Sequence, residues 1–141
     1  MRRHDPPAWV LFDGYCGLCN GLVRWLVRTD RRRALRFGAL QGRVAAEVRA
    51  RHPDLPDADE TLVLVEAPGT PVERVRLRSD GVLAMLARLG GAWRWVAFLR
   101  LVPRSLGDLV YRFVARRRTR WFGRLDRCRL PSPEERERFL E

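Results

Sequence analysis

The stretch Trp9-Val10-Leu11-Phe12-Asp13-Gly14-Tyr15-Cys16-Gly17-Leu18-Cys19 decides the fold, because it leads from a buried strand into a helix through two cysteines. Its first four residues form a continuous apolar run, which is typical of a strand covered on both faces. Asp13-Gly14 has turn chemistry and ends that run. From Leu18 onward apolar side chains recur at helical spacing, and this pattern predicts a helix that closes at Arg31-Arg32-Arg33.

Outward from this stretch, the chain continues as a series of strands and helices. Apolar and turn patterns predict strands at 35–40, 61–65 and 72–78, and helices at 42–51, 79–89, 93–102 and 105–114, with a last helix starting near 131. The first two strands should be parallel, because a helix joins them by a right-handed crossover, and the next two should form a hairpin. We therefore predict an α/β fold with a thioredoxin-like βαβαββα core and additional C-terminal helices.

The 141 residues should form a single domain, with a flexible lead-in at 1–8 and a C-terminal helical extension at 92–141. Ser79 and Ser105 are predicted to cap the helices that follow them. Within the extension an amphipathic helix is expected, with an apolar face made by Leu106, Leu109, Val110, Phe113 and Val114. The aromatic residues nearby are expected to pack in the core rather than form a binding face; these are Trp93, Trp95, Trp121 and Phe122.

Cys16 and Cys19 are the main candidate catalytic residues. Side chains three positions apart at a helix start lie on the same side, so the two sulfurs can close a small disulfide. Unpaired backbone N–H groups and the helix dipole favour a thiolate at Cys16, and the thiolate is the attacking species. We predict that Cys16 is the nucleophile and the more exposed thiol, and that Cys19 resolves the mixed disulfide.

Two other interpretations of the cysteine pair stay open. A single C-x-x-C is half of a zinc site, and Cys128, His4 or His52 could complete it only from distant positions. The pair could also be two buried and inert small side chains. The context of strand, turn, cysteine pair and helix favours redox chemistry, with neither a metal nor an organic cofactor.

Asp13 is a third candidate catalytic residue, because a carboxylate three residues before Cys16 could shuttle a proton during thiol exchange. It could equally cap backbone N–H groups in the turn. A phosphatase nucleophile at Asp13 would need a second acid two residues on, where Tyr15 stands. Cys128 is either a second resolving thiol or a buried structural cysteine.

The charge balance suggests a second class of function. All 28 basic residues are arginine and 17 residues are acidic, which gives a net charge of +11. Such a surface attracts anionic lipid, nucleic acid or acidic partners, or it is simply solvated. The alternative function is therefore a basic binding module for anionic lipid or nucleic acid, with an inert cysteine pair.

Three cysteines are too few for a disulfide-dense secreted scaffold, and no stretch has the apolar length of a signal-peptide core or a membrane span. We expect a cytoplasmic protein. Its expected partner is a disulfide-containing protein or a small thiol, with peripheral contact to an anionic membrane as an option and no specific nucleic acid.

The segment Asp13-Gly14-Tyr15-Cys16-Gly17-Leu18-Cys19-Asn20 resembles the signature of the DCC family of thiol-disulfide oxidoreductases, which is named for its Asp-Cys-Cys pattern. Later segments resemble the family in the same order, at 79–82, 110–116, 120–123 and 128–131. The resemblance covers nearly the whole chain and implies a thioredoxin-like fold and protein-disulfide oxidoreductase activity. It marks Asp13, Cys16 and Cys19 as the signature positions, and it makes Cys128 a further position to consider.

The chain departs from thioredoxins proper before its third predicted strand. Thioredoxins place a cis proline there, beside the disulfide, whereas Asp59-Glu60 precede Thr61 in this chain. A substrate is therefore not expected to dock by the usual thioredoxin route. The function predicted from the sequence is exchange of a Cys16–Cys19 dithiol or disulfide with protein or small-molecule disulfides.

Overall fold

The computed structural model describes residues 7–13, 15–31, 33–40, 42–55, 62–123 and 138–140. The described elements follow the predicted order, and the last element before residue 123 is a long helix. They are β1 (Ala8–Phe12), α1 (Gly17–Thr29), β2 (Leu35–Ala39), α2 (Arg43–Arg51), β3 (Val63–Glu66), β4 (Arg74–Leu77), α3 (Arg78–Ala87), the 3-10 helix η1 (Gly91–Leu101) and α4 (Arg104–Phe122).

The four strands form one mixed sheet in the order β2-β1-β3-β4. β1 runs parallel to β2, with Val10 opposite Phe37, and antiparallel to β3, with Val10 opposite Leu64. β4 pairs antiparallel with β3. This arrangement confirms the mixed α/β class and the strand pairings of a thioredoxin-like core.

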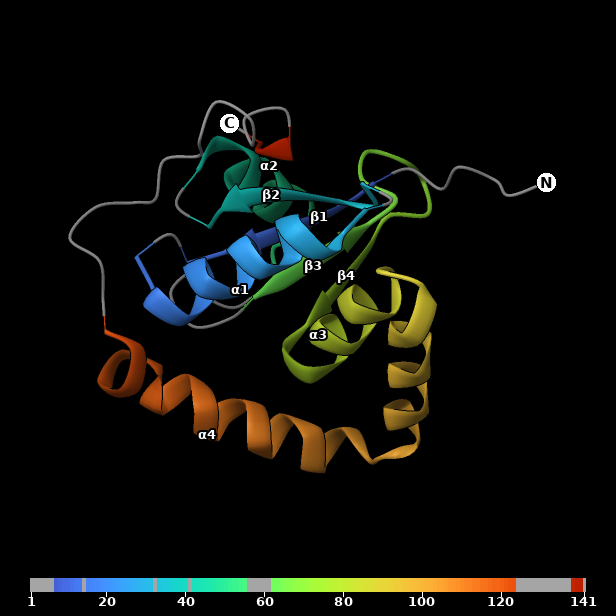
Figure 1. The fold of residues 1–141 in the computed structure, drawn as a ribbon. Helices are drawn as coiled ribbons and strands as arrows, with labels where there is room; N and C mark the ends of the chain where they lie inside the picture. The colour runs from blue at the N-terminus through green and yellow to red at the C-terminus, as the bar shows by residue number, and fades with distance from the viewer. Residues whose placement is uncertain are drawn as a thin grey trace.

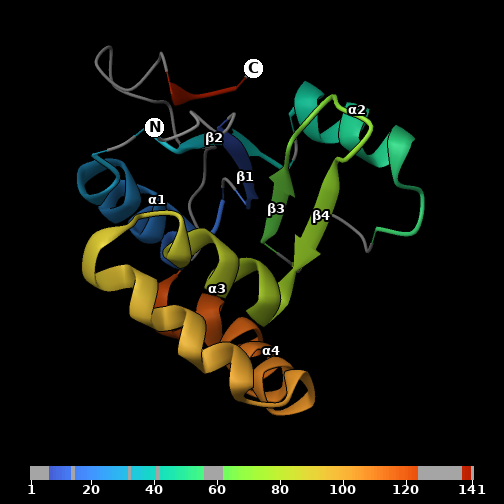
Figure 2. The same cartoon turned by 90° about the vertical axis from the view of Figure 1, so that its right-hand side faces the viewer.

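Helices cover both faces of the sheet, which explains why β1 is apolar at every position (Figures 1 and 2). Val10 and Phe12 point into a core shared with α1 and α3. Leu11 points to the other face, where it packs in a smaller cluster with α2. Since neither face of β1 meets water, an alternating pattern is replaced by a continuous apolar run.

β4 leads directly into α3, without a loop. The helix starts at Arg78, and its N-cap residue is Leu77, which makes no side-chain capping bond. The prediction of a cap at Ser79 is therefore wrong, because the helix has already begun there. Gly81 permits this tight junction, since a Cβ at this position would lie 2.9 Å from the carbonyl oxygen of Arg76.

The prediction of a cap at Ser105 is also wrong, because α4 begins one residue earlier. The carbonyl oxygen of Pro103 accepts hydrogen bonds from the N–H groups of Leu106 and Gly107, so the first turn forms directly after this proline. α4 then runs for 19 residues along one side of the molecule (Figure 1). The preceding segment η1 is helical as predicted, but its turns are of the 3-10 type.

Several aromatic and aliphatic residues of η1 and α4 are not buried as expected. Trp93 packs on the core and meets Trp25 edge to face, at 5.0 Å between ring centroids. Trp95 and Trp121 are exposed, however, and the side chain of Phe122 lies outside the described set. Most of the predicted apolar face of α4 is exposed as well: Leu106, Leu109, Val110 and Phe113. The sequence pattern identified an amphipathic helix here, but the described domain covers only part of its apolar face.

Residues 138–140 lie at the free edge of β2, where Phe139 bridges to Phe37 in parallel (Figure 2). The N–H of Leu140 donates to the carbonyl of Phe37 at 2.6 Å. The helix start predicted near residue 131 falls outside the described residues. Within the described ranges, no helix combines the length and apolarity needed to cross a bilayer.

Candidate redox site

Cys16 is the N-cap residue of α1, as the sequence predicts. Its backbone is extended, and its Sγ accepts a hydrogen bond from the N–H of Cys19 at 3.4 Å. The first intrahelical bond runs from the N–H of Asn20 to the carbonyl of Cys16. The sulfur therefore lies at the N-terminal end of the helix, where the dipole is positive.

The first turn of α1 receives a second backbone contact from far along the chain. The N–H of Gly17 donates to the carbonyl of Gly123, at 3.2 Å, just beyond the end of α4. The side-chain amide of Asn20 donates to the carbonyl of Cys16 at 2.8 Å and holds the other side of the turn. One of the N–H groups expected to lack a partner at this helix start, that of Gly17, is therefore bonded to the residue that follows α4.

Both thiols are reduced and buried. Cys16 is 4% exposed and Cys19 is 9% exposed. The expectation that Cys16 is the more exposed thiol is therefore wrong. The reason is tertiary, because Cys16 packs into the hydrophobic core between the sheet, α1 and α3.

Asp13 lies at the end of β1 and is buried, with 4% of its surface exposed. Its Oδ1 accepts a hydrogen bond from the N–H of Tyr15 at 3.0 Å, while its carbonyl accepts from the N–H of Cys16 at 3.2 Å. These bonds shape the turn that delivers Cys16 to the helix start. The turn role of Asp13 is thus visible in the structure, and a proton-transfer role remains a prediction.

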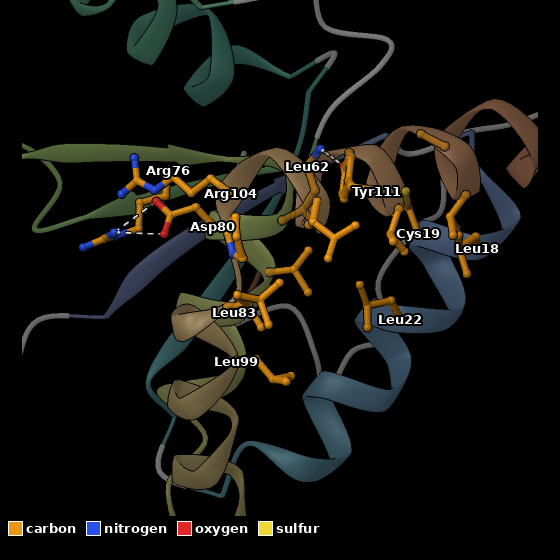
Figure 3. A pocket seen from close by; sticks show the side chains of 18 residues that line it. Leu18, Cys19, Leu22, Leu62, Arg76, Asp80, Leu83, Leu99, Arg104 and Tyr111 are labelled. Atoms are coloured by element: carbon orange, nitrogen blue, oxygen red, sulfur yellow. Dashed lines mark hydrogen bonds and ion pairs between the residues drawn. The ribbon is translucent and has the colours of Figure 1, made fainter.

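A cavity of about 740 Å³ opens beside Cys19, between α1, α3, η1 and α4 (Figure 3). Leu18, Cys19 and Leu22 of α1 form one end, and most other lining side chains are aliphatic. Arg76 and Asp80 lie at the opposite end of the view (Figure 3). A volume of this size is within the range of small-molecule sites. Sequence reasoning missed it, because its walls come from five separate elements, which are α1, β4, α3, η1 and α4.

At the charged end of the cavity, one arginine is paired with two carboxylates. Arg76 contacts Glu66 at 3.0 Å and Asp80 at 3.0 Å. These two carboxylates raise the pKa of the Arg76 guanidinium against the lowering effect of its burial. The third charged lining residue, Arg104, is exposed at the start of α4.

Tyr111 of α4 lines the cavity and connects its wall to the start of β3. Its hydroxyl accepts a hydrogen bond from the N–H of Leu62 at 2.9 Å, immediately before β3. This is the region where thioredoxins place their proline, and here a side chain from α4 occupies it. Together with the Gly123 contact, this bond makes α4 part of the site, which no local sequence pattern indicated.

The distant zinc ligands considered from sequence are not brought together by the described residues. His52 lies at the end of α2, and its Nε2 contacts Glu73 at 2.7 Å. His4 and Cys128 fall outside the described residues, so the role of Cys128 stays a prediction.

Comparisons with known proteins agree with this geometry. The model of the DCC1-like thiol-disulfide oxidoreductases matches residues 10–124, which include both cysteines, the sheet and α4. An uncharacterized protein of Bacillus subtilis, YuxK, is 32% identical over 96% of this chain and 95% of its own length. A chloroplastic DCC family protein of Arabidopsis thaliana is 36% identical over 91% of this chain and 72% of its own length. No solved structure matches. With a fold, a cysteine pair and a family match that agree over most of its length, this chain belongs to the DCC1-like thiol-disulfide oxidoreductase family.

Proposed function

We propose that this protein exchanges its Cys16–Cys19 dithiol or disulfide with the disulfides or thiols of a partner. The observation that carries the proposal is the placement of Cys16 Sγ at the N-cap of α1, with the N–H of Cys19 directed at it. Membership of a thiol-disulfide oxidoreductase family supports the same chemistry. Cys16 acts as the nucleophile, because its sulfur accepts a hydrogen bond from a helix N–H group and lies at the positive end of the helix dipole.

The exchange function is tested by measuring the turnover of a protein disulfide in the presence of a dithiol reductant. We expect Cys16→Ser to abolish turnover and Cys19→Ser to trap the partner on Cys16, visible as a mass increase of the intact protein. A Cys16→Ser variant that works as well as the parent would falsify the assignment of the nucleophile. Redox titration with mass spectrometry then identifies the joined sulfurs and shows whether Cys128 takes part.

Asp13 is proposed to move a proton during exchange, in addition to shaping the turn. Asp13→Asn is the matched test, because the amide oxygen can still accept from Tyr15 while the carboxylate is lost. A lower exchange rate with an altered pH profile, at unchanged stability, would support proton transfer. An unchanged profile would leave Asp13 with the turn role alone.

We further propose that the exchange takes place in the cytoplasm, where thiols are kept reduced. The small number of cysteines supports this placement. Cell fractionation followed by immunodetection tests it, and recovery of the protein with an oxidising compartment would contradict it.

A second candidate function is peripheral binding to an anionic membrane. Ten of the twelve large exposed apolar side chains found among the described residues lie in η1, in α4 or between them. α4 contains six arginines and one acidic residue, Asp108. Apolar side chains interleaved with arginine favour a lipid surface over nucleic acid, since they can enter the headgroup region of a bilayer.

Vesicle sedimentation tests this second function. We expect binding to vesicles with anionic lipid and weak binding to neutral ones, and we expect Arg112→Glu with Arg116→Glu to abolish binding. The double variant Arg36→Glu with Arg43→Glu is the control, because it makes the same charge change on exposed sites of β2 and α2. Equal losses in both double variants would mean that net charge alone attracts the protein, and this result would remove the proposed surface.

A further inference from the structure

The only thiol that lines the described cavity is Cys19. Cys16 does not line it and lies in the adjoining core, where its Sγ accepts a hydrogen bond from the N–H of Cys19 at 3.4 Å. Gly123 lies against the first turn of α1 on the outside. In the described structure, this cavity therefore offers a molecule access to Cys19 (Figure 3).

We infer that the disulfide exchanged by this pair carries apolar, uncharged groups and reaches Cys19 through the cavity. The inference rests on the proposed exchange function and names its substrate class. Leu18 and Leu22 of α1 lie beside Cys19 in the lining, which also includes Val110 and Val114 of α4 (Figure 3). Apolar groups on either side of a substrate disulfide would remove these side chains from water, which is the main source of affinity in such a site.

A charged disulfide is disfavoured in this cavity. Arg76 contacts both Glu66 and Asp80. The exposed Arg104 lies on the same side of the cavity as Arg76 and Asp80, away from Cys19 (Figure 3). Near Cys19 the lining offers aliphatic side chains and Tyr111, and no counter-charge (Figure 3). A carboxylate or ammonium group carried to the pair would lose its hydration without gaining a partner.

The substrate disulfide is the oxidant, and it accepts the two electrons that the cysteine pair gives up. One thiolate of the pair attacks one sulfur of R–S–S–R, which forms a mixed Cys–S–S–R disulfide and releases the first thiolate, which takes up a proton. The other thiolate of the pair then attacks the bonded cysteine sulfur, which forms the Cys16–Cys19 disulfide and releases the second thiol. Two electrons and two protons pass from the pair to the substrate, and each of the two leaving groups departs as R–SH.

Two probes of equal size test the inference. Dipropyl disulfide and bis(2-hydroxyethyl) disulfide differ only in a terminal methyl or hydroxyl at each end. The oxidation rate of the reduced protein with each probe is divided by the rate of a free dithiol with the same probe, which removes intrinsic reactivity. We expect the normalised rate to be roughly tenfold higher for dipropyl disulfide, because two methyl-sized groups become buried.

A matched pair of variants locates the preference. Leu106 and Leu109 lie on the same helix and are 52% and 65% exposed, but only Leu106 lines the cavity. We expect Leu106→Asn to reduce the normalised rate with dipropyl disulfide by roughly fivefold, which corresponds to about 1 kcal/mol of lost apolar contact. The rate with the hydroxyethyl probe should not change, and Leu109→Asn should change neither rate.

The possible failures are distinguishable. Equal normalised rates for the two probes, or equal effects of the Leu106 and Leu109 variants, would overturn the substrate class and leave the exchange function standing. If neither probe oxidises the parent faster than it modifies a Cys16→Ser variant, the exchange function fails, and the substrate class fails with it. A tenfold preference that Leu106→Asn selectively weakens supports both.

Discussion

The N–H of Gly17 donates to the carbonyl of Gly123 at 3.2 Å, and this bond connects the start of the cysteine-bearing helix to a residue 106 positions later. Gly123 has a φ of 75°. This left-handed conformation turns the chain at the end of α4 and directs the carbonyl at α1. A conformation that glycine adopts readily therefore helps to determine how deeply Cys16 is buried.

Gly123→Ala should expose Cys16. A Cβ at this position meets no other atom within 4 Å, so the strain comes from the positive φ alone, at about 1 kcal/mol. A weaker contact at Gly17 should raise the rate of Cys16 alkylation by roughly fivefold, measured by iodoacetamide labelling with peptide mass spectrometry.

Gly69→Ala is the control for this experiment, because Gly69 has the same φ of 75° and also has no neighbour within 4 Å of an added Cβ. It lies in the turn between β3 and β4, away from the pair. Equal acceleration of Cys16 labelling in both variants would show that general destabilisation exposes the thiol, and would contradict a specific cover at Gly123.

Gly21→Ala should stabilise the protein. Gly21 lies in the interior of α1 and is exposed, and an added Cβ would meet nothing within 4 Å. Alanine restricts the unfolded chain and favours the helix by roughly 0.5–1 kcal/mol. Urea denaturation should show this gain with an unchanged slope, while a loss of stability would mean that the site holds a contact that alanine cannot keep.

Glu73→Gln should make the free energy of unfolding less dependent on pH in the acid range. Glu73 accepts hydrogen bonds from Arg51, from the N–H of Gly69 and from His52, and these bonds, chiefly that of Arg51, lower its pKa from 4.5 to about 2. A carboxyl with a lowered folded-state pKa stabilises the protein above its unfolded pKa, and this contribution is lost as the pH falls through the folded-state value. The parent should therefore lose stability between about pH 4.5 and 2.

At pH 7 the Glu73→Gln variant should be less stable by about 1–2 kcal/mol, after allowance for the solvent that screens the partly exposed Arg51. Near pH 2 the two proteins should be equal. Denaturation curves at a series of pH values measure this difference. Glu47→Gln is the control, because Glu47 is exposed, contacts the exposed Arg43 at 3.6 Å and should change stability little at any pH.

Asp30 and Arg138 should behave as a coupled buried pair. The Asp30 carboxylate accepts from the N–H groups of Ala34 and Leu35, and Arg138 donates to it from near the other end of the chain. Asp30→Asn and Arg138→Met should each destabilise the protein by about 3 kcal/mol, because each leaves a buried charge without its partner. In denaturation measurements the double variant should cost less than the sum of the two, and strict additivity would refute the coupling.

The sequence alone predicted the features that depend on local pattern. The apolar run of β1, the turn at Asp13 and the spacing of Cys16 and Cys19 are readable because strand burial, turn chemistry and helix periodicity act over a few residues. The pairing of the strands followed from the same patterns, because a helical crossover and a short hairpin leave few topologies.

Tertiary structure alone decided the environment of the pair. Cys16 is buried because it joins the core between the sheet and the helices, and the cavity beside Cys19 exists because four helical segments meet. Gly123 bonds to Gly17, and Tyr111 bonds to Leu62 across 49 positions. Local periodicity shows which face of a helix is apolar, but it does not show what covers that face. Leu106 and Trp95 illustrate this, since their patterns predict burial while their side chains remain exposed.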